Sequence, residues 1–253
     1  MTDFDQRCIG LIADSHGNLE ATEQAIRLLK GRGAGLIVHL GDFCDSVRHH
    51  QAAAMIALLE DQGILAVKGN NDFLVENMLA DRRPETPDGE RALAFLKAVP
   101  ITRAVDGLRF AHSLPFDSLR SFYMPIDTGN TRRAEQLFAE ADFQILFCGH
   151  SHLPALFLEA GGRVTRESMA AGEKIVLATS RCGESPGEAV RSGGADAVPD
   201  LPGAAAGGER KSADRGGHCA GQRFIVVVGA AEDGECAFYD RATGAYERLR
   251  IFT

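Results

Sequence analysis

Residues 8–18 read CIGLIADSHGN and residues 36–42 read LIVHLGD. Each stretch opens with a short apolar run of the kind that forms a buried strand, and each run leads to an aspartate. A helical stripe of apolar residues from Leu19 to Lys30 separates the two runs. The pattern then repeats with a helix at Ala52 to Glu60 and a strand at Leu65 to Lys68. The order β-α-β-α-β predicts a parallel sheet covered by helices.

The middle of the chain is rich in predicted helices. Met78 to Ala80 indicates one helix end, Gly89 to Ala98 is typical of a helix that ends before the next proline, and Thr131 to Ala141 is typical of another. Residues 103–111 contain two short strand-like runs around Asp-Gly, which predicts a tight β-hairpin. Gln144 to Cys148 is again a buried-strand run.

After residue 152 the pattern changes to strands without intervening helices. Ala155 to Leu158 and Ile175 to Ala178 are strand-like. Three closing strands, expected to be antiparallel, are Phe224 to Gly229, Glu235 to Tyr239 and Ala245 to Ile251. Residues 183–222 are rich in Gly, Ala, Pro, Ser and charge, which predicts a mobile insertion. We expect a single domain of residues 1–253, with helices that flank either one mixed sheet or two packed sheets.

The composition of the 253 residues limits the classes of function. Hydrophobic residues make up 45% and charged residues 25%, as in an ordinary globular protein, and the net charge of −8 argues against a nucleic-acid partner. No apolar run approaches the roughly 20 residues of a membrane span, and Met1 to Arg7 lacks the basic start of a signal peptide. We therefore expect a cytoplasmic protein with no membrane partner, whose six cysteines are free thiols in or near the core.

Five side chains that can bind a metal stand at or just beyond the ends of strand-like runs: Asp14, Asp42, Asn70, His112 and His150. In open α/β sheets the carboxyl ends of the strands form the edge where ligands bind. The sequence therefore predicts that these side chains meet at one edge.

Two further histidines extend this set, because His16 follows Asp14 and His152 follows His150 at i, i+2 spacing. In extended backbone alternate side chains point the same way, so each pair is expected to present two ligands to one site. Carboxylate, imidazole and amide oxygen together suit Mn²⁺, Fe²⁺ or Zn²⁺. Seven ligands are too many for one tetrahedral ion and suit two ions with a shared bridge. Asp42 is the natural bridge, because a carboxylate can give one oxygen to each ion.

The motifs resemble those of the calcineurin-like metallophosphoesterase family, in its small prokaryotic phosphodiesterase branch. The family pattern is D-x-H, G-D, G-N-x-D, a lone H and G-H-x-H, in that order. The chain matches it with Asp14-Ser15-His16, Gly41-Asp42, Gly69-Asn70-Asn71-Asp72, His112 and Gly149-His150-Ser151-His152. Each motif alone is weak evidence, whereas the complete ordered set is specific.

The resemblance implies an α/β fold in four layers, with two mixed β-sheets packed together and flanked by helices. It implies one metal held by Asp14, His16, Asp42 and His152, and a second held by Asp42, Asn70, His112 and His150. It also implies a dinuclear hydrolase, first of all a phosphodiesterase, that cleaves a small phosphoester substrate by attack of a metal-bridging hydroxide. Two divalent transition-metal ions are the expected cofactors, with Mn²⁺ favoured and Fe, Zn or Ni as alternatives.

The chain departs from the family pattern beside Asn70. Many family members have a histidine where this chain has Asn71, and that histidine contacts the scissile phosphate. Asparagine can donate a hydrogen bond but cannot supply a proton near neutral pH, so we expect a preference for leaving groups that need little protonation. Asp72 is expected to orient Asn71 or a metal ligand. We therefore count Asn71 and Asp72 as candidate catalytic residues.

Two other classes of function stay open at this point. A scaffold that keeps the fold without catalysis would be expected to lose ligands, and all seven positions of this chain are ligand-competent. A nucleotide pyrophosphatase or a phosphomonoesterase could use the same metals, and the sequence has no recognisable base-binding motif that would favour one of them. The acidic net charge disfavours a nuclease, and the sequence gives no indication of an oligomeric state.

Overall fold

The computed structural model describes residues 7–177 and 221–252. The insertion predicted at residues 183–222 lies outside the described residues, apart from Gly221 and Gln222. None of the described helices is both long and apolar enough to cross a bilayer.

The described residues form two six-stranded β-sheets. The first sheet contains β1 (Cys8–Ile12), β2 (Leu36–His39), β3 (Leu65–Ala66), β9 (Lys174–Val176), β11 (Glu235–Asp240) and β12 (Ala245–Arg250). The second contains β4 (Thr102–Val105), β5 (Leu108–Ala111), β6 (Ile145–Cys148), β7 (Ala155–Ala160), β8 (Arg163–Ser168) and β10 (Arg223–Val227). The strand orders are β3-β2-β1-β11-β12-β9 and β4-β5-β6-β10-β7-β8, and both sheets mix parallel with antiparallel pairs.

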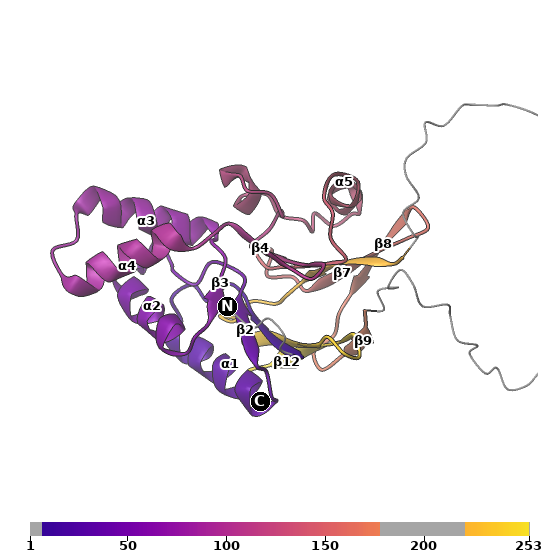
Figure 1. Cartoon of the computed structure of the whole chain (residues 1–253), viewed down its shortest axis with the longest axis horizontal. Coiled ribbons are helices and arrows are strands. Elements are labelled where there is room, and N and C mark those ends of the chain that lie inside the picture. Colours follow the sequence, from indigo (N-terminus) through magenta and orange to yellow (C-terminus); the bar gives the residue numbers. More distant parts are fainter. Residues whose placement is uncertain (1–6, 178–220, 253) are drawn as a thin grey trace, which may run out of the picture.

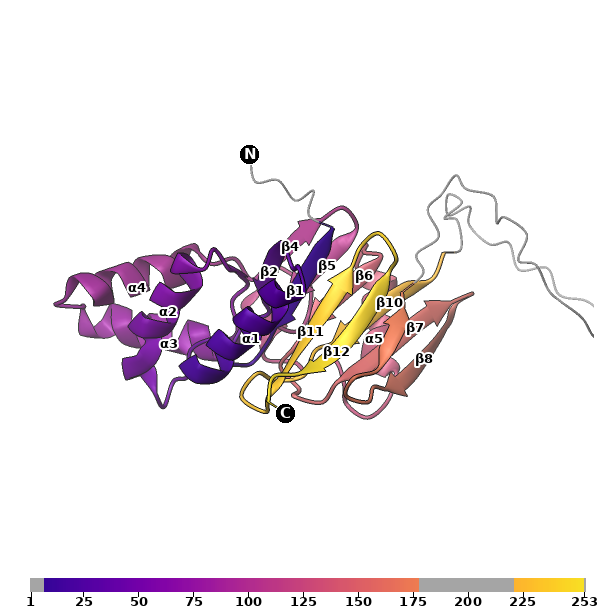
Figure 2. The ribbon, with the colours of Figure 1, turned by 90° about the horizontal axis from the view of Figure 1, so that it is seen from below.

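Helices cover the outer faces of the two sheets. They are α1 (Leu19–Gly31), α2 (Ala52–Asp61), α3 (Asn70–Arg82), α4 (Pro87–Ala98) and α5 (Arg132–Glu140), with short 3-10 turns η1 (His49–Gln51) and η2 (Leu119–Phe122). Figure 1 shows α1 below the first sheet and α5 above the second, and Figure 2 shows α2, α3 and α4 grouped at the end of the molecule away from β7 and β8. The expected architecture of two packed mixed sheets between helices is therefore confirmed.

Three buried clusters hold these layers together. One lies between α1 to α4 and the first sheet, one between the sheets, and one between the second sheet and α5. Phe147 on β6 shows how the sheets are joined, because its fully buried ring lies 5.2 Å from the ring of Tyr239 on β11 and 6.2 Å from that of Tyr246 on β12. Burial of such aromatic area dominates the energetics of a core.

Local signals explain where several elements begin and end. The Asn18 side chain accepts a hydrogen bond from the Ala21 N–H at 3.1 Å and caps α1, whose buried side chains have helical spacing. The hairpin of β4 and β5 turns at Asp106 and Gly107, which have φ of 47° and 79° as a two-residue type I′ turn requires.

Three expectations from the sequence were incomplete or wrong. Strand β8 was missed because its sequence, RVTRES, is polar and lies at the edge of its sheet. Only the end of α3 was expected, because the helix begins with polar site residues and buries little besides Asp72 and Val75. The expectation that the closing strands are antiparallel was only half right for β10. That strand lies between β6 and β7, is antiparallel to β7 and is parallel to β6.

Candidate metal centre

The ligand positions predicted from the sequence converge at the carboxyl ends of the strands. Asp14 and Asp42 follow the parallel strands β1 and β2, and Asn70 is the first residue of α3 after β3. His112 follows β5 directly, and His150 follows β6, which is parallel to β5. The two sheets therefore bring their strand ends to the same place, as the edge rule for α/β sheets requires.

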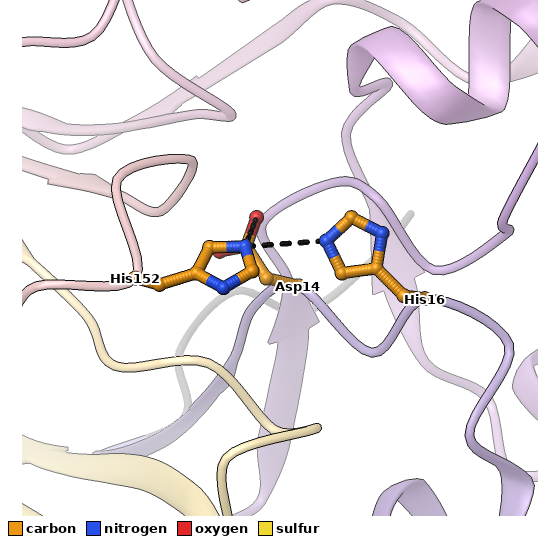
Figure 3. A group of neighbouring side chains, drawn as sticks. All are labelled: Asp14, His16 and His152. Carbon is orange, nitrogen blue, oxygen red and sulfur yellow. Dashed lines mark hydrogen bonds and ion pairs between the residues drawn. The ribbon is translucent and has the colours of Figure 1, made fainter.

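The first group of potential ligands contains Asp14, His16 and His152 (Figure 3). The Nε2 atoms of His16 and His152 lie 3.2 Å apart, and His152 Nε2 lies 3.5 Å from Asp14 Oδ1. The figure shows both rings pointing toward the space beside the Asp14 carboxylate.

The second group contains Asp42, His112 and His150, with Asn70 beside it. His112 Nε2 lies 3.0 Å from His150 Nδ1, 3.1 Å from Asn70 Oδ1 and 3.5 Å from Asp42 Oδ2. The same Asp42 oxygen lies 3.9 Å from His16 Nε2 in the first group. Asp42 is thus the residue through which the two groups meet.

The tautomer of His112 indicates that this arrangement suits a cation. The Leu40 carbonyl oxygen lies 3.0 Å from His112 Nδ1, and a carbonyl can only accept, so Nδ1 carries the proton. In the neutral ring, the lone pair of Nε2 faces Asn70 Oδ1 and His150 Nδ1. Exchange of the Asn70 amide O and N would let this nitrogen donate to His112 Nε2 at 3.1 Å and to His150 Nδ1 at 3.2 Å. A divalent cation among these acceptors would make the inward amide oxygen favourable, so the residues fit such an ion.

Backbone conformation aims the ligands inward and costs free energy. Of the seven non-glycine residues with positive φ in the described part of the chain, five are predicted ligands, at φ of 44° to 72°. These five are Asp14, His16, Asp42, His150 and His152. Left-handed conformations cost about 1–3 kcal/mol each and cluster at functional sites, where the surrounding structure maintains them.

These φ values overturn the assumption that the two i, i+2 pairs lie in extended backbone. Asp14 and His16 do lie in one group, whereas His150 and His152 lie in different groups. The tight turn after Gly149 separates the two histidines, so each of them reaches a different cluster. The assumption failed because the loops after strand ends are turns, where the alternation of a strand no longer applies.

Hydrogen bonds between the ligand loops maintain this geometry. The His16 N–H donates to the Asp42 carbonyl oxygen at 2.9 Å, and the Asp14 N–H donates to the Gly41 carbonyl oxygen at 3.1 Å. The His150 N–H donates to Asp14 Oδ2 at 2.9 Å. Three of the ligand loops are therefore fixed to one another before any ion binds.

Asn71 and Asp72, the two predicted catalytic residues, hold Asp42 in place. The Asn71 N–H and Nδ2 each donate to an oxygen of the Asp42 carboxylate at 2.8 Å, and Asn71 Oδ1 accepts from Ser46 Oγ at 3.0 Å. The buried Asp72 carboxylate accepts from the N–H groups of Asp42, Gly69 and Cys44, each at 2.8 Å. Asp72 thus orients a predicted ligand, and the Asn71 amide is engaged at both ends.

Burial and neighbouring charges shift the acid–base behaviour of the site. Burial, with the proximity of His112, lowers the pKa of His150 to about 4, which keeps its ring neutral and able to act as a ligand. Burial and the Asp42 carboxylate raise the pKa of Asp72 to about 8, against the effect of its backbone donors. Burial also lowers the pKa of His39 to about 3, and this ring packs within the fold with Nε2 2.8 Å from Ser15 Oγ.

Sequence reasoning missed one acidic residue at the centre and left one basic residue undecided. Glu232 Oε1 lies 3.6 Å from His16 Nε2 and 3.6 Å from His152 Nδ1. Its Oε2 lies 3.7 Å from Arg48 Nη2, and Arg48 also pairs with Asp45 at 2.7 Å. No local motif marks Glu232, because it reaches the site through contacts between distant segments, namely the pairing of β11 with β1 and the hydrogen bonds between its turn and the Asp14 loop.

The chain is similar to proteins of one superfamily. The model of the calcineurin-like phosphoesterase superfamily domain matches residues 8–172. An uncharacterised protein of Methanocaldococcus jannaschii, MJ0912, is 25% identical over 173 residues, which are 63% of this chain and 68% of that protein.

Solved structures share the fold at low sequence identity. A metallophosphoesterase from Sphaerobacter thermophilus aligns with a TM-score of 0.62 and 18% identity over 97% of this chain and 88% of that one. The protein TT1561 of Thermus thermophilus aligns with a TM-score of 0.51 and 12% identity over 98% of this chain and 100% of that one.

Proposed function

Because the chain belongs to the calcineurin-like phosphoesterase superfamily, we propose that it is a phosphodiesterase whose centre holds two divalent cations. One cation would be held by Asp14, His16, Asp42 and His152, and the other by Asp42, Asn70, His112 and His150. Mn²⁺ is the cation proposed first, with Fe, Zn or Ni as alternatives, because the set combines carboxylate, amide and imidazole donors. A cytoplasmic location stays a prediction from the sequence.

The position of Asp42 is the observation that carries this proposal. Its Oδ2 atom lies 3.5 Å from a ring nitrogen of the second group and 3.9 Å from a ring nitrogen of the first. Two divalent cations held there would neutralise phosphoryl oxygens and lower the pKa of water, so that water could act as a nucleophile at neutral pH.

The chain's own residues contribute position and charge. Asn71 and Asp72 fix the Asp42 carboxylate and its backbone, and the Leu40 carbonyl oxygen fixes the ring of His112. Arg48, held by Asp45 and Glu232 beside the first group, is the arginine that the geometry favours as a contact for the substrate phosphate. Arg120 is exposed on η2, and Arg181 lies outside the described residues.

One feature favours a diester over a monoester, and a second concerns the leaving group. The carboxylates of Glu232 and Asp233 lie within 3.7 Å of His152 Nδ1, and like charge disfavours the second negative charge of a monoester. The amide of Asn71 is engaged with Asp42 and Ser46, so it supplies no proton to a leaving group. We therefore expect substrates with good leaving groups to react fastest.

The experiment is a substrate panel with the purified full-length chain, loaded in turn with Mn²⁺, Fe²⁺, Zn²⁺ and Ni²⁺. It compares bis-p-nitrophenyl phosphate with p-nitrophenyl phosphate and with a dinucleoside polyphosphate. The proposal expects the diester to have the highest kcat/KM. A higher kcat/KM for the monoester would instead indicate a phosphomonoesterase, and a higher value for the polyphosphate would indicate a nucleotide pyrophosphatase. No turnover with any metal would indicate a scaffold without catalysis.

A further inference from the structure

The side chain of Glu232 occupies a position beside the first ligand group that the family motifs do not cover. It lies in the turn between β10 and β11, downstream of the matched residues 8–172. We propose that Glu232 is a positioning residue of the metal centre, and that its charge keeps the proton of His152 on Nδ1 and the lone pair on Nε2. This inference rests on the proposed two-cation centre.

The two ring nitrogens of His152 have different surroundings. Nε2 faces His16 Nε2 at 3.2 Å and Asp14 Oδ1 at 3.5 Å, which is the side of the ligand group. Nδ1 faces carboxylate oxygens of Glu232 at 3.6 Å and of Asp233 at 3.7 Å. A neutral imidazole has one N–H and one lone pair, so a ring that binds through Nε2 must carry its proton on Nδ1.

Without a cation, carboxylates flank both ring nitrogens, because Asp14 Oδ1 lies 3.5 Å from Nε2. A cation held by Asp14 would neutralise the first carboxylate, and the Glu232 carboxylate beside Nδ1 would then favour the tautomer that binds through Nε2. At 3.6 Å the Glu232 oxygen is beyond a full hydrogen bond, so its effect on the ring is that of a nearby negative charge. Carboxylates in this place orient metal-binding histidines and raise their basicity, and their loss typically weakens metal binding about 10- to 100-fold.

Glu232 is better placed for this role than its neighbour Asp233. The Glu232 N–H donates to the Asp14 carbonyl oxygen at 3.3 Å, and the Ala231 N–H donates to the Ala13 carbonyl oxygen at 2.7 Å. The turn is therefore attached to the loop that carries Asp14. The Glu232 side chain is 29% exposed, whereas that of Asp233 is 59% exposed, and water screens the more exposed charge more strongly.

A second contact fixes the direction of the Glu232 side chain. Its Oε2 atom lies 3.7 Å from Arg48 Nη2, and Arg48 Nε donates to Asp45 Oδ2 at 2.7 Å. The arginine therefore draws one carboxylate oxygen outward while the other oxygen faces the histidines. One residue from the C-terminal part of the chain thus links the metal centre to the proposed phosphate contact.

The test measures metal binding by the apoprotein in two ways. Calorimetric titration with Mn²⁺ gives the affinity of each binding step, and the visible absorption of bound Co²⁺ reports the surroundings of the metal. In the Glu232→Gln variant, one of the two binding steps is expected to weaken about 10- to 100-fold, with the other step unchanged. The Co²⁺ spectrum is expected to change in parallel. Glu232→Ala is expected to behave like Glu232→Gln, because the charge is what both variants lack.

Asp233→Asn is the matched control and is expected to keep both steps within about threefold of the parent chain, since its carboxylate is screened. Apoprotein melting temperatures check that all variants fold alike. Equal weakening by Asp233→Asn, or normal binding by Glu232→Gln, would overturn the inference. If the parent chain binds two cations but cleaves no phosphoester, the proposed activity fails and the role of Glu232 stands. If it binds none, both fail.

Discussion

Gly69→Ala places one methyl group where the structure has no room for it. Gly69 immediately precedes α3 and has φ of −99° and ψ of −179°, a conformation that alanine also adopts, so the backbone alone does not forbid the change. A Cβ at this position would overlap the Asp42 carboxylate and would lie 2.9 Å from its Cγ atom. The substitution therefore acts directly on the carboxylate that joins the two ligand groups.

The expected cost follows from the overlap. Extra methylene-sized groups in a packed site cost about 1–3 kcal/mol of the free energy of unfolding, which for a chain of this length corresponds to a melting temperature lower by roughly 2–12 °C. Since Asp42 is held by two hydrogen bonds from Asn71, each of 2.8 Å, the displaced carboxylate also loses its oriented partners. We expect the variant to retain fewer than two tightly bound cations.

The assay is thermal unfolding of the apoprotein together with metal content after loading and gel filtration. Gly31→Ala is the control, because Gly31 is in α1 and a Cβ there would meet nothing within 4 Å. That change is expected to be neutral or to stabilise by roughly 0.5–1 kcal/mol. A Gly69→Ala protein that melts like the Gly31→Ala protein and binds two cations would refute the close approach on which this reasoning depends.

Three further predictions concern the core, an ion pair and the substrate. Phe147→Ala should lower the free energy of unfolding in urea by about 3–5 kcal/mol, because the ring joins the sheets, and a loss below about 1 kcal/mol would contradict that packing. Burial raises the pKa of Asp127, but hydrogen bonds, chiefly from Arg166, outweigh it and leave the pKa below its usual value. The parent chain should therefore have a higher free energy of unfolding than the Asp127→Asn variant above about pH 4, and this difference should decline as the pH falls further. A difference that persists in stronger acid would be inconsistent with the ion pair of Asp127 and Arg166. Arg48→Ala should raise KM for a diester about tenfold, with a smaller change in kcat. The control Arg120→Ala, at an exposed position, should leave KM and kcat unchanged. An unchanged KM in Arg48→Ala would show that Arg48 does not contact the substrate.

Much of the candidate site could be predicted because its residues stand where strands end. Asp14 and Asp42 follow apolar runs that form parallel neighbours in one sheet, and His112 and His150 follow parallel neighbours in the other. The strand pattern is local and the edge rule is general, so short motifs sufficed to predict their convergence.

Other features depend on contacts between distant segments. Glu232 reaches the centre because β11 pairs with β1, which brings residues more than 200 positions apart into register. The alternation of apolar residues in a strand shows that a strand forms, but it does not show which distant strand becomes its neighbour. For the same reason, the mixed surroundings of β10 and the polar edge strand β8 could not be predicted from their own residues.

The direction of the ligand side chains was the other feature that could not be predicted from the sequence. The pair His150 and His152 has the same spacing as the pair Asp14 and His16, and all four residues have positive φ. Asp14 and His16 lie in one ligand group, whereas His150 and His152 lie in different groups. Positive φ at Asp and His is uncommon and is maintained by the surrounding loops, so it follows from tertiary structure rather than from the local sequence.

Counting the bound ions tests the central claim most directly. The purified chain is loaded with Mn²⁺, passed through gel filtration and analysed for metal per chain by elemental analysis, beside its Asp42→Asn variant. We predict two equivalents in the parent chain and at most one, weakly held, in the variant, because Asp42 joins the two ligand groups. A parent chain with a single ion, or a variant that keeps both, would contradict the account.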